Sequence, residues 1–214
     1  MRKTRHSTAA PPPAAPIEVR AEKLVYGPDA LAHYENRAVF VPFLLPGELA
    51  RVRPIEQKKK FIRGRVEQIL EPSPERIAAP CPHFGVCGGC AVQHWDTARY
   101  RAWKRGLVVE ALRQAGLAAP FAELIDAHGA GRRRAVFHAR RGSHDVLEVG
   151  FSAARSHRLV AIDRCPILAP DLDGAIEAAW AIAEALDAGC VVVFEDTRVR
   201  IRTLPIGDAG SAGN

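Results

Sequence analysis

Four of the five cysteines have the spacing of ligands to an inorganic centre. Cys81, Cys87 and Cys90 follow one another as Cys-x5-Cys-x2-Cys, and Cys165 lies far downstream. Three clustered thiolates and one remote thiolate are a common way to hold a cubic iron–sulfur cluster. The pattern therefore predicts a 4Fe–4S cluster bound by these four residues.

The loop that carries the three local cysteines is rich in glycine. Gly85, Gly88 and Gly89 would let the backbone wrap round a cluster, where its N–H groups can donate to sulfur. Cys165, within Asp163-Arg164-Cys165-Pro166, would close the site and tie a later sheet to the loop. Because neither a redox partner nor a resolving cysteine is visible in the sequence, we expect the cluster to be structural.

Structural zinc is the alternative for this site. Zinc sites usually have two Cys-x2-Cys pairs, or cysteine and histidine at matched spacing. The chain has one such pair, and His83 and His94 are near enough in sequence to complete a zinc site. The spacing favours a cluster and leaves zinc open. Cys190 stands alone at an expected helix-to-strand turn and is predicted to be a buried, inert thiol.

The distribution of charge indicates a polyanionic partner. Residues 1–170 carry 27 Lys and Arg against 16 Asp and Glu, whereas residues 171–214 carry 3 against 8. A basic front part is typical of nucleic-acid binding, although a solvated basic surface would look the same. The residues we predict to contact RNA are Lys58, Lys59, Lys60, Arg63, Arg65, Arg132, Arg134 and His138. Alternate strand residues share a face, so Arg132, Arg134 and His138 should point to one side.

Short apolar runs between turn residues dominate the first third of the chain. Gly27-Pro28-Asp29 and Pro46-Gly47-Glu48 are typical turn sequences. The strands that we predict between such turns are residues 17–20, 38–41, 49–52 and 63–70. Strands of this number and spacing predict a small OB-like β-barrel over residues 17–72.

A proline-rich linker, Glu71-Pro72-Ser73-Pro74, separates this barrel from a predicted mixed α+β domain over residues 73–205. A helix from about residue 96 to 115 has an apolar stripe of Trp103, Leu107 and Ala111, which we expect in the core. The other expected elements are a helix over 172–186 and strands over 135–140, 147–151, 159–162, 191–194 and 198–201. The fold class is therefore α+β.

The two ends of the chain have the composition of unstructured segments. Residues 1–16 form a Pro/Ala-rich arm, and residues 206–214 a tail dominated by small residues. No run approaches the roughly 18 consecutive apolar residues of a membrane helix. The start has no apolar region of a signal peptide, so we expect a cytoplasmic protein without a membrane partner.

Several stretches resemble known RNA-modifying proteins. Residues 17–70 resemble a TRAM domain, a small RNA-binding β-barrel, through Leu24-Val25-Tyr26-Gly27, Val39-Phe40-Val41-Pro42, Leu45-Pro46-Gly47-Glu48 and Leu70-Glu71-Pro72-Ser73-Pro74. Residues 81–90, followed by Gln93-His94, look like the cluster loop of the iron–sulfur RNA (uracil-5-)-methyltransferases. Arg132-Arg133-Arg134 through Phe137-His138 resembles that family's Arg-rich strand. Gly150-Phe151, Ser156-His157 and Asp163-Arg164-Cys165-Pro166 look like the segment with the fourth ligand. Pro28 and Ala30 depart from the family, whose members have more glycine there.

The resemblance, which covers about residues 17–190, implies the RNA-binding and cluster-binding part of such an enzyme. Members with both a TRAM-like domain and a cluster mostly act on 23S ribosomal RNA. Their doubly wound domain binds S-adenosylmethionine and supplies a nucleophilic cysteine and a carboxylate base. After the second helix, fewer residues remain than the roughly 30 that one βαβ unit needs.

We therefore expect this domain to be absent, S-adenosylmethionine to be required only in a full-length form, and the chain alone to be inactive. The alternative is a free-standing RNA-binding iron–sulfur or zinc protein that works with a separately encoded catalytic domain.

Overall fold

The computed structural model describes residues 15–25, 27–117, 123–125, 131–142, 145–186, 190–195 and 198–203. The chain forms two compact units. The first runs to Ile77 and also includes His94–Tyr100, and the second comprises Ala78–Gln93 and the residues from Arg101 onward. The predicted linker at residues 71–74 therefore falls inside the first unit. The predicted arm and tail lie outside the described residues, apart from the last two positions of the arm.

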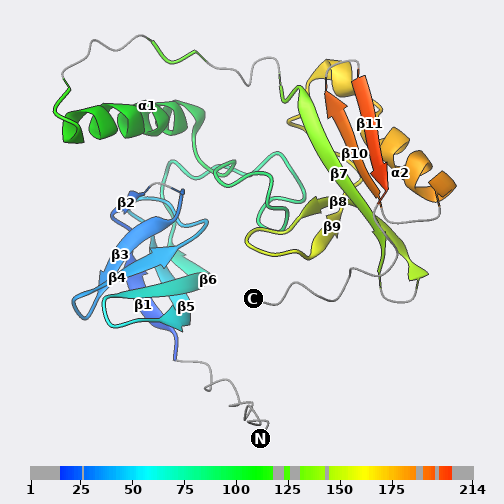
Figure 1. The fold of residues 1–214 in the computed structure, drawn as a ribbon. Helices are drawn as coiled ribbons and strands as arrows, with labels where there is room; N and C mark the ends of the chain where they lie inside the picture. Colours follow the sequence, from blue (N-terminus) through cyan, green and yellow to red (C-terminus); the bar gives the residue numbers. More distant parts are fainter. Residues whose placement is uncertain are drawn as a thin grey trace, which may run out of the picture. The chain divides into compact units, whose positions relative to one another are not determined.

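The first unit is a six-stranded sheet that curls round its own core (Figure 1). Its strands are β1 (Ile17–Arg20), β2 (Lys23–Leu24), β3 (Ala30–Tyr34), β4 (Arg37–Val41), β5 (Leu49–Gln57) and β6 (Phe61–Glu71). Their order in the sheet is β1-β5-β6-β4-β3-β2, and only the β4–β6 pair is parallel. Alternate residues of each strand point inward, including Val19, Ala32, Val39, Val52 and Ile62.

Gly64 shows why one inward position of β6 has no side chain. A Cβ there would lie 2.3 Å from Cγ1 of Val52 on the neighbouring strand, so the tight curvature of the sheet requires glycine. The four strands predicted for this region are confirmed, whereas β2 and β3 were missed.

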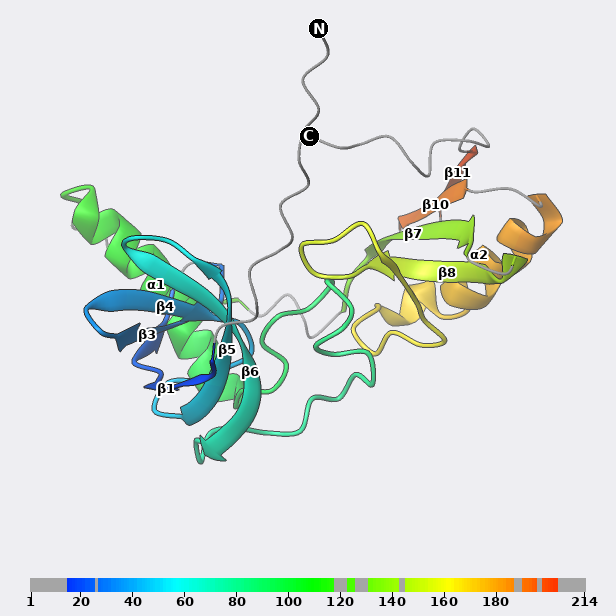
Figure 2. The ribbon, with the colours of Figure 1, turned by 90° about the horizontal axis from the view of Figure 1, so that it is seen from below.

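The second unit contains a five-stranded antiparallel sheet of order β11-β10-β7-β8-β9. The strands are β7 (Arg134–Arg141), β8 (Leu147–Ser152), β9 (Leu159–Ala161), β10 (Cys190–Glu195) and β11 (Arg198–Thr203). Helix α2 (Ala175–Leu186), preceded by the 3-10 turn Pro170–Leu172, packs along one face of this sheet (Figure 2). Together the two units confirm the α+β class.

The core of the second unit lies between α2 and that face of the sheet. Phe137 of β7 stacks on Phe151 at 5.1 Å between ring centroids and meets the edge of Phe194 at 5.7 Å. Ala179 and Ala183 of α2 are fully buried against them. Cys190 also lies in this core and is fully buried, as predicted, and burial raises the pKa of its thiol.

Helix α1 (Thr97–Gln114) forms where it was predicted, but it does not pack as expected. None of its residues is buried; Trp103 and Leu107 are half-exposed and Ala111 is exposed. The helix passes from the first unit into the second after Tyr100 and contributes to neither core. The apolar stripe is therefore not a core stripe among the described residues. In the part of the chain that the structure describes, no helix is long and apolar enough to span a membrane.

Candidate functional site

The loop of Cys81, Cys87 and Cys90 is fastened to the end of β8. Gly88 N–H donates to the Ser152 carbonyl at 2.9 Å, and Cys87 forms an antiparallel bridge with Ala153. A Cβ on Gly88 would lie 2.8 Å from the Ser152 oxygen and 2.9 Å from the Ala154 nitrogen. The loop can approach β8 this closely only because position 88 is glycine.

Two further contacts bring the segment of Cys165 to the same loop. The imidazole Nε2 of His83 lies 2.8 Å from a carboxylate oxygen of Asp163. Arg132 bridges both segments, because its guanidinium donates to the Gly89 carbonyl at 3.1 Å and its N–H to the Ile167 carbonyl at 2.7 Å. Cys87 and Cys165 both pack against the core of the second unit.

The four thiols, all half-buried, interact electrostatically. Burial raises the pKa of Cys90, and the neighbouring thiols of Cys165 and Cys87 act in the same direction. Burial likewise raises the pKa of Cys165, reinforced by Cys81 and Cys87. Arg132 opposes the rise at both. The remote cysteine and the three local ones thus share one environment.

Hydrogen-bond donors also reach the sulfur atoms in this environment. Gly89 N–H donates to Sγ of Cys87 at 3.3 Å, and the Ile167 N–H donates to the Cys165 sulfur. Half-buried thiols with N–H donors and a nearby guanidinium suit a thiolate-ligated anionic cluster, whose sulfurs accept such bonds. Across the described ranges, no group of three or more His, Cys, Asp and Glu side chains is placed to hold a metal ion. The 4Fe–4S assignment therefore stays a prediction.

The two histidines considered as zinc ligands are engaged elsewhere. His83 pairs with Asp163, as described above. His94 belongs to the first unit, where it is buried with its ring centroid 6.3 Å from that of Phe43. Burial, together with the nearby charge of Arg76, lowers the pKa of His94 to about 4.

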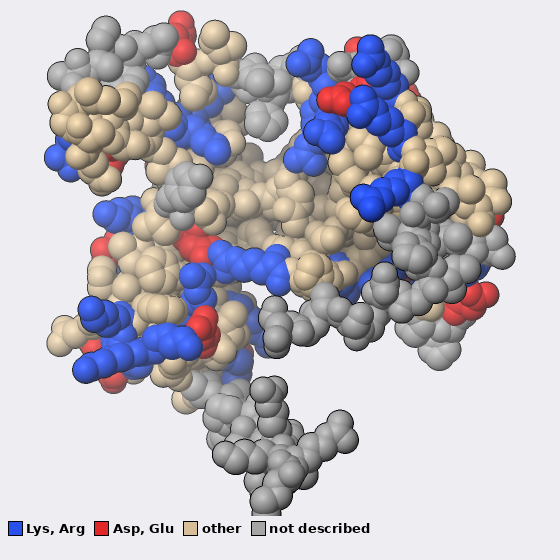
Figure 3. Space-filling view, viewed as in Figure 1, with Lys and Arg blue, Asp and Glu red and all other residues tan. Residues whose placement is uncertain are grey.

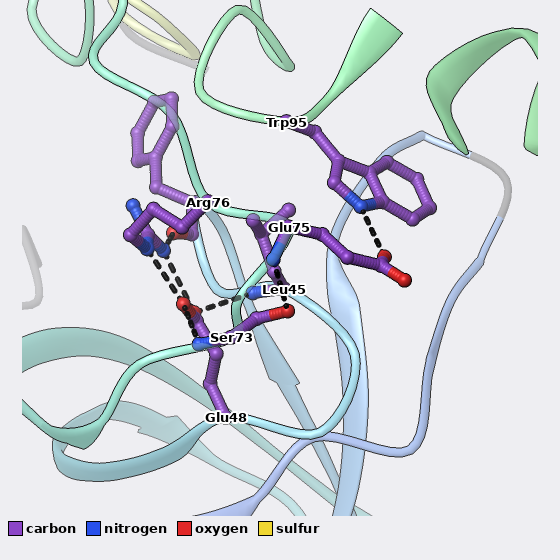
Figure 4. A network of polar contacts seen from close by, with 7 residues as sticks. Leu45, Glu48, Ser73, Glu75, Arg76 and Trp95 are labelled. Atoms are coloured by element: carbon purple, nitrogen blue, oxygen red, sulfur yellow. Dashed lines mark hydrogen bonds and ion pairs between the residues drawn. The ribbon is translucent and has the colours of Figure 1, made fainter. Parts of the chain in front are cut away.

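A buried carboxylate in the first unit lies at the centre of a network of hydrogen bonds (Figure 4). Glu48 is fully buried and accepts hydrogen bonds from the N–H groups of Leu45 at 2.8 Å and Ser73 at 3.1 Å. Arg76 donates to both of its oxygens, and the indole of Trp95 donates to Glu75 at 2.9 Å. This network fastens residues 73–77 and 94–96 to the sheet, and it was missed in the sequence.

The basic residues predicted on the first unit lie at one hairpin. Lys58, Lys59 and Lys60 form the exposed turn between β5 and β6. Lys58 lies 3.4 Å from Glu56. Arg63 contacts Asp29 at 3.5 Å and Glu56 at 3.6 Å, with its guanidinium over the rings of Phe40 and Phe61. Arg65 is exposed on β6.

The basic residues predicted on the second unit divide between two places. Arg134 and His138 lie exposed on the same side of β7. Arg132 precedes β7 and is held at the cysteine loop by its bonds to Gly89 and Ile167. The expectation that all three share a strand face is therefore wrong for Arg132, because β7 begins only at Arg134.

Comparison with known proteins finds relatives over most of the chain. No family model matches. A protein of Caulobacter vibrioides named an uncharacterized RNA methyltransferase is 43% identical over 151 residues, which cover 70% of this chain and 35% of that protein. A protein of Halomonas elongata named 23S rRNA (uracil(1939)-C(5))-methyltransferase is 35% identical over 185 residues, or 82% of this chain and 38% of that protein.

A solved structure shares the fold. The tRNA (uracil-54, C5)-methyltransferase of Pyrococcus abyssi, solved with S-adenosyl-L-homocysteine, has a TM-score of 0.56 and 21% identity over 89% of this chain and 47% of its own. The chain spans 35% and 38% of the length of the two curated relatives described above. Over most of its own length, this chain is similar to proteins named RNA methyltransferases.

Proposed function

We propose that this chain is the RNA-binding and cluster-binding portion of an S-adenosylmethionine-dependent RNA (uracil-5-)-methyltransferase that acts on 23S ribosomal RNA. The observation that carries the proposal is the 43% identity to a protein named an RNA methyltransferase over 151 residues. The relative named as a 23S rRNA methyltransferase supports the choice of RNA.

In this proposal, Cys81, Cys87, Cys90 and Cys165 hold a 4Fe–4S cluster, which supplies a covalent cross-link between two segments distant in sequence. Contacts within the chain already hold the two segments in place. Gly88 brings the loop against β8, and Arg132 fixes the positions of Gly89 and Ile167. The arginine and the backbone N–H donors also offset the negative charge that four thiolates would bring.

The two units would bind RNA while methyl transfer takes place elsewhere. The TRAM-like first unit offers the lysines of its β5–β6 turn, and the second unit offers the exposed arginines of its sheet. The nucleophilic cysteine, the carboxylate base and the S-adenosylmethionine site would come from a catalytic part that these 214 residues do not supply. Uracil would be flipped out of the RNA to reach that part.

The test is a comparison of RNA binding and methyl transfer by the purified chain. We expect it to bind a 23S ribosomal RNA transcript with an affinity that falls steeply with salt. We expect no transfer of labelled methyl from S-adenosylmethionine. Methyl transfer by the chain alone, or absence of RNA binding at low salt, would contradict the proposal.

A further inference from the structure

The sheet of the second unit has one covered face and one open face. Helix α2 covers the side on which Phe137, Val192 and Phe194 are buried. The opposite side is formed by the alternate residues of each strand, and no described helix packs on it. What this open face displays follows from the strand register.

Two of the three arginines of β11 stand in register, across β10, with the predicted RNA-binding residues of β7. Across β10, Arg198 aligns with Glu195 and then Arg134. Arg202 aligns with Val191 and then His138 by the same pairing. Arg200 lies between them, opposite Val193. Because directly paired residues point to the same side of a sheet, these arginines share the open face.

The open face is strongly basic. Over β7, β8, β10 and β11 it carries five arginines against two glutamates, a net charge of 5 − 2 = +3; these residues are Arg134, Arg140, Arg198, Arg200, Arg202, Glu148 and Glu195. Figure 3 shows basic side chains, which here are all arginines, gathered over β7, β10 and β11, with an acidic side chain among them.

Acidic residues on the helical side of the unit increase the difference in charge between its two sides. Asp171, Asp173, Glu177 and Glu184 are exposed on the 3-10 turn, on the residue that follows it and on α2, across the core from the open face. An approaching polyanion would therefore be drawn to the open face of the sheet and repelled from the helix.

The β11 arginines are free to bind a partner, unlike most arginines of the first unit. Within the described residues, Arg134, Arg198, Arg200 and Arg202 make no ion pair. In the first unit, by contrast, arginines are paired with acids; the pairs are Arg20–Glu71, Arg37–Glu35, Arg51–Glu18, Arg53–Glu67 and Arg63–Asp29. A guanidinium without a carboxylate partner can form its two parallel hydrogen bonds with a phosphate.

From this geometry we infer that the open face of β11, β10 and β7 is a phosphate-binding surface for an RNA strand, with Arg198, Arg200 and Arg202 as its principal contacts. The inference rests on the proposed function for the identity of the polyanion. Successive arginines of β11 are two residues apart, or about 6.8 Å along the strand. They can therefore follow neighbouring phosphates of one strand.

The chemistry of the face indicates contact with the RNA backbone rather than with its bases. Val136, Val191 and Val193 occupy the positions between the charged rows. Among the described residues of this face, no Phe, Tyr or Trp is available to stack on a base. Binding should therefore be independent of sequence and governed by counterion release.

The test is the salt dependence of RNA binding by the full chain, compared with an Arg198→Gln/Arg200→Gln/Arg202→Gln variant. With a single-stranded RNA, log K falls as log salt rises, and loss of three phosphate contacts should make this negative slope shallower by about 2. The affinity should fall by about tenfold or more. The matched control, Arg20→Gln/Arg51→Gln/Arg53→Gln, removes the same charge from arginines held in ion pairs and should keep the wild-type slope.

Outcomes separate this inference from the proposed function. A wild-type slope in the β11 variant, while the chain still binds RNA, overturns the inference alone. A chain that binds no RNA overturns both. Vesicles containing phosphatidylglycerol serve as the competing polyanion. Loss of vesicle binding in the β11 variant with unchanged RNA binding would assign the face to a membrane and overturn the inference.

A second measurement does not depend on the folding of the variants. Phenylglyoxal modifies accessible arginines, and mass spectrometry locates the modified residues in the wild-type chain. We expect bound RNA to protect Arg198, Arg200 and Arg202, and to leave Arg51 modified to the same extent as without RNA. Equal modification of the β11 arginines with and without RNA would also overturn the inference.

Discussion

Arg76 holds the buried carboxylate of Glu48 with two hydrogen bonds, from Nε at 2.6 Å to one oxygen and from Nη2 at 2.7 Å to the other. Glu48 is fully buried, and about a quarter of the Arg76 side chain is exposed. Arg76 also donates to the Phe43 carbonyl at 2.9 Å. One ion pair thus connects the turn before β5 to the segment that leaves β6.

We predict that Arg76→Met destabilises the first unit by about 3 kcal/mol, because it leaves a buried carboxylate without its cation. The control is Arg51→Met. Arg51 pairs with Glu18 at 3.2 Å, but both side chains are about half exposed, so the loss should be about 0.5 kcal/mol. Urea unfolding followed by tryptophan fluorescence measures both, since Trp95 lies in the affected network. Equal losses in the two variants would mean that the Glu48 pair contributes no more than a surface pair.

Acid should weaken the same region in two steps. The pKa of His94 is lowered from 6.5 to about 4, first by burial and then by Arg76. The unfolded chain therefore gains a proton at His94 before the folded chain does. Stability is full above pH 6.5 and falls as the pH drops toward 4.

Glu48 adds the second step. Burial alone would raise its pKa, but hydrogen bonds from Arg76, Leu45 and Ser73 outweigh burial and hold the pKa below 4.5. Its contribution is present above pH 4.5 and is lost as the pH falls through the lowered value. In urea titrations at a series of pH values, His94→Phe should flatten the loss of stability between pH 6.5 and 4. A variant with the wild-type pH profile would exclude His94 as its cause.

Gly88 should be required for the cysteine loop to meet β8. Its Cβ would lie within 3.1 Å of three backbone atoms of residues 152–154, and backbone cannot move aside cheaply. We predict that Gly88→Ala lowers the iron content of the purified chain. Gly106→Ala, where an added Cβ meets nothing within 4 Å, should leave iron unchanged and stabilise α1 by about 1 kcal/mol. Equal iron content in the two variants would show that this approach does not shape the site.

The lysines of the β5–β6 turn should contribute to RNA affinity through charge. Reversal of charge at Lys58, Lys59 and Lys60 to glutamate should weaken binding at least about tenfold and reduce its salt dependence. The matched control reverses the same number of positive charges on α1, at Arg99, Lys104 and Arg105, and shows how much of the effect comes from net charge alone. Filter binding at several salt concentrations gives both quantities. Unchanged affinity in the Lys58–Lys60 variant would remove this turn from the interface.

Local patterns allowed much of the fold to be predicted, and long-range pairing explains what was missed. The segments that form β1, β4, β5 and β6 show alternation of apolar and polar residues or apolar runs, and the structure has strands at these positions. β3 was missed because Ala30-Leu31-Ala32-His33 has no β-branched residue, and its pairing with β4 stabilises it. The stripe of α1 was wrongly expected to be buried. Periodicity indicates which residues share a face of a helix, but it does not indicate whether another element covers that face.

The candidate sites show the same limit. The cysteines were predictable because three lie in one glycine-rich loop. Glu48 was not, because a glutamate beside Pro46-Gly47 has the sequence context of an exposed turn. The arginines of β11 were overlooked because they lie in a net acidic segment. Only the register with β10 and β7 places them on the same face as Arg134 and His138, one strand away across β10.

Replacement of single cysteines should separate ligands from bystanders. We predict that Cys87→Ser and Cys165→Ser give colourless, poorly folded protein, because each thiol packs on the core of the second unit and holds one end of the proposed cross-link. Cys190→Ala, which alters a buried thiol in the core, should keep the brown colour of the wild type. Visible absorbance after anaerobic purification makes the comparison. Retained colour in Cys87→Ser or Cys165→Ser would exclude that residue as a ligand.

The most direct test of the account is the iron, acid-labile sulfide and zinc content of the chain purified without oxygen. We predict about four iron and about four sulfide per chain, with a broad visible absorption band and no zinc. One zinc per chain without sulfide, or protein that folds fully with neither metal, would contradict the cluster that links Cys165 to the glycine-rich loop.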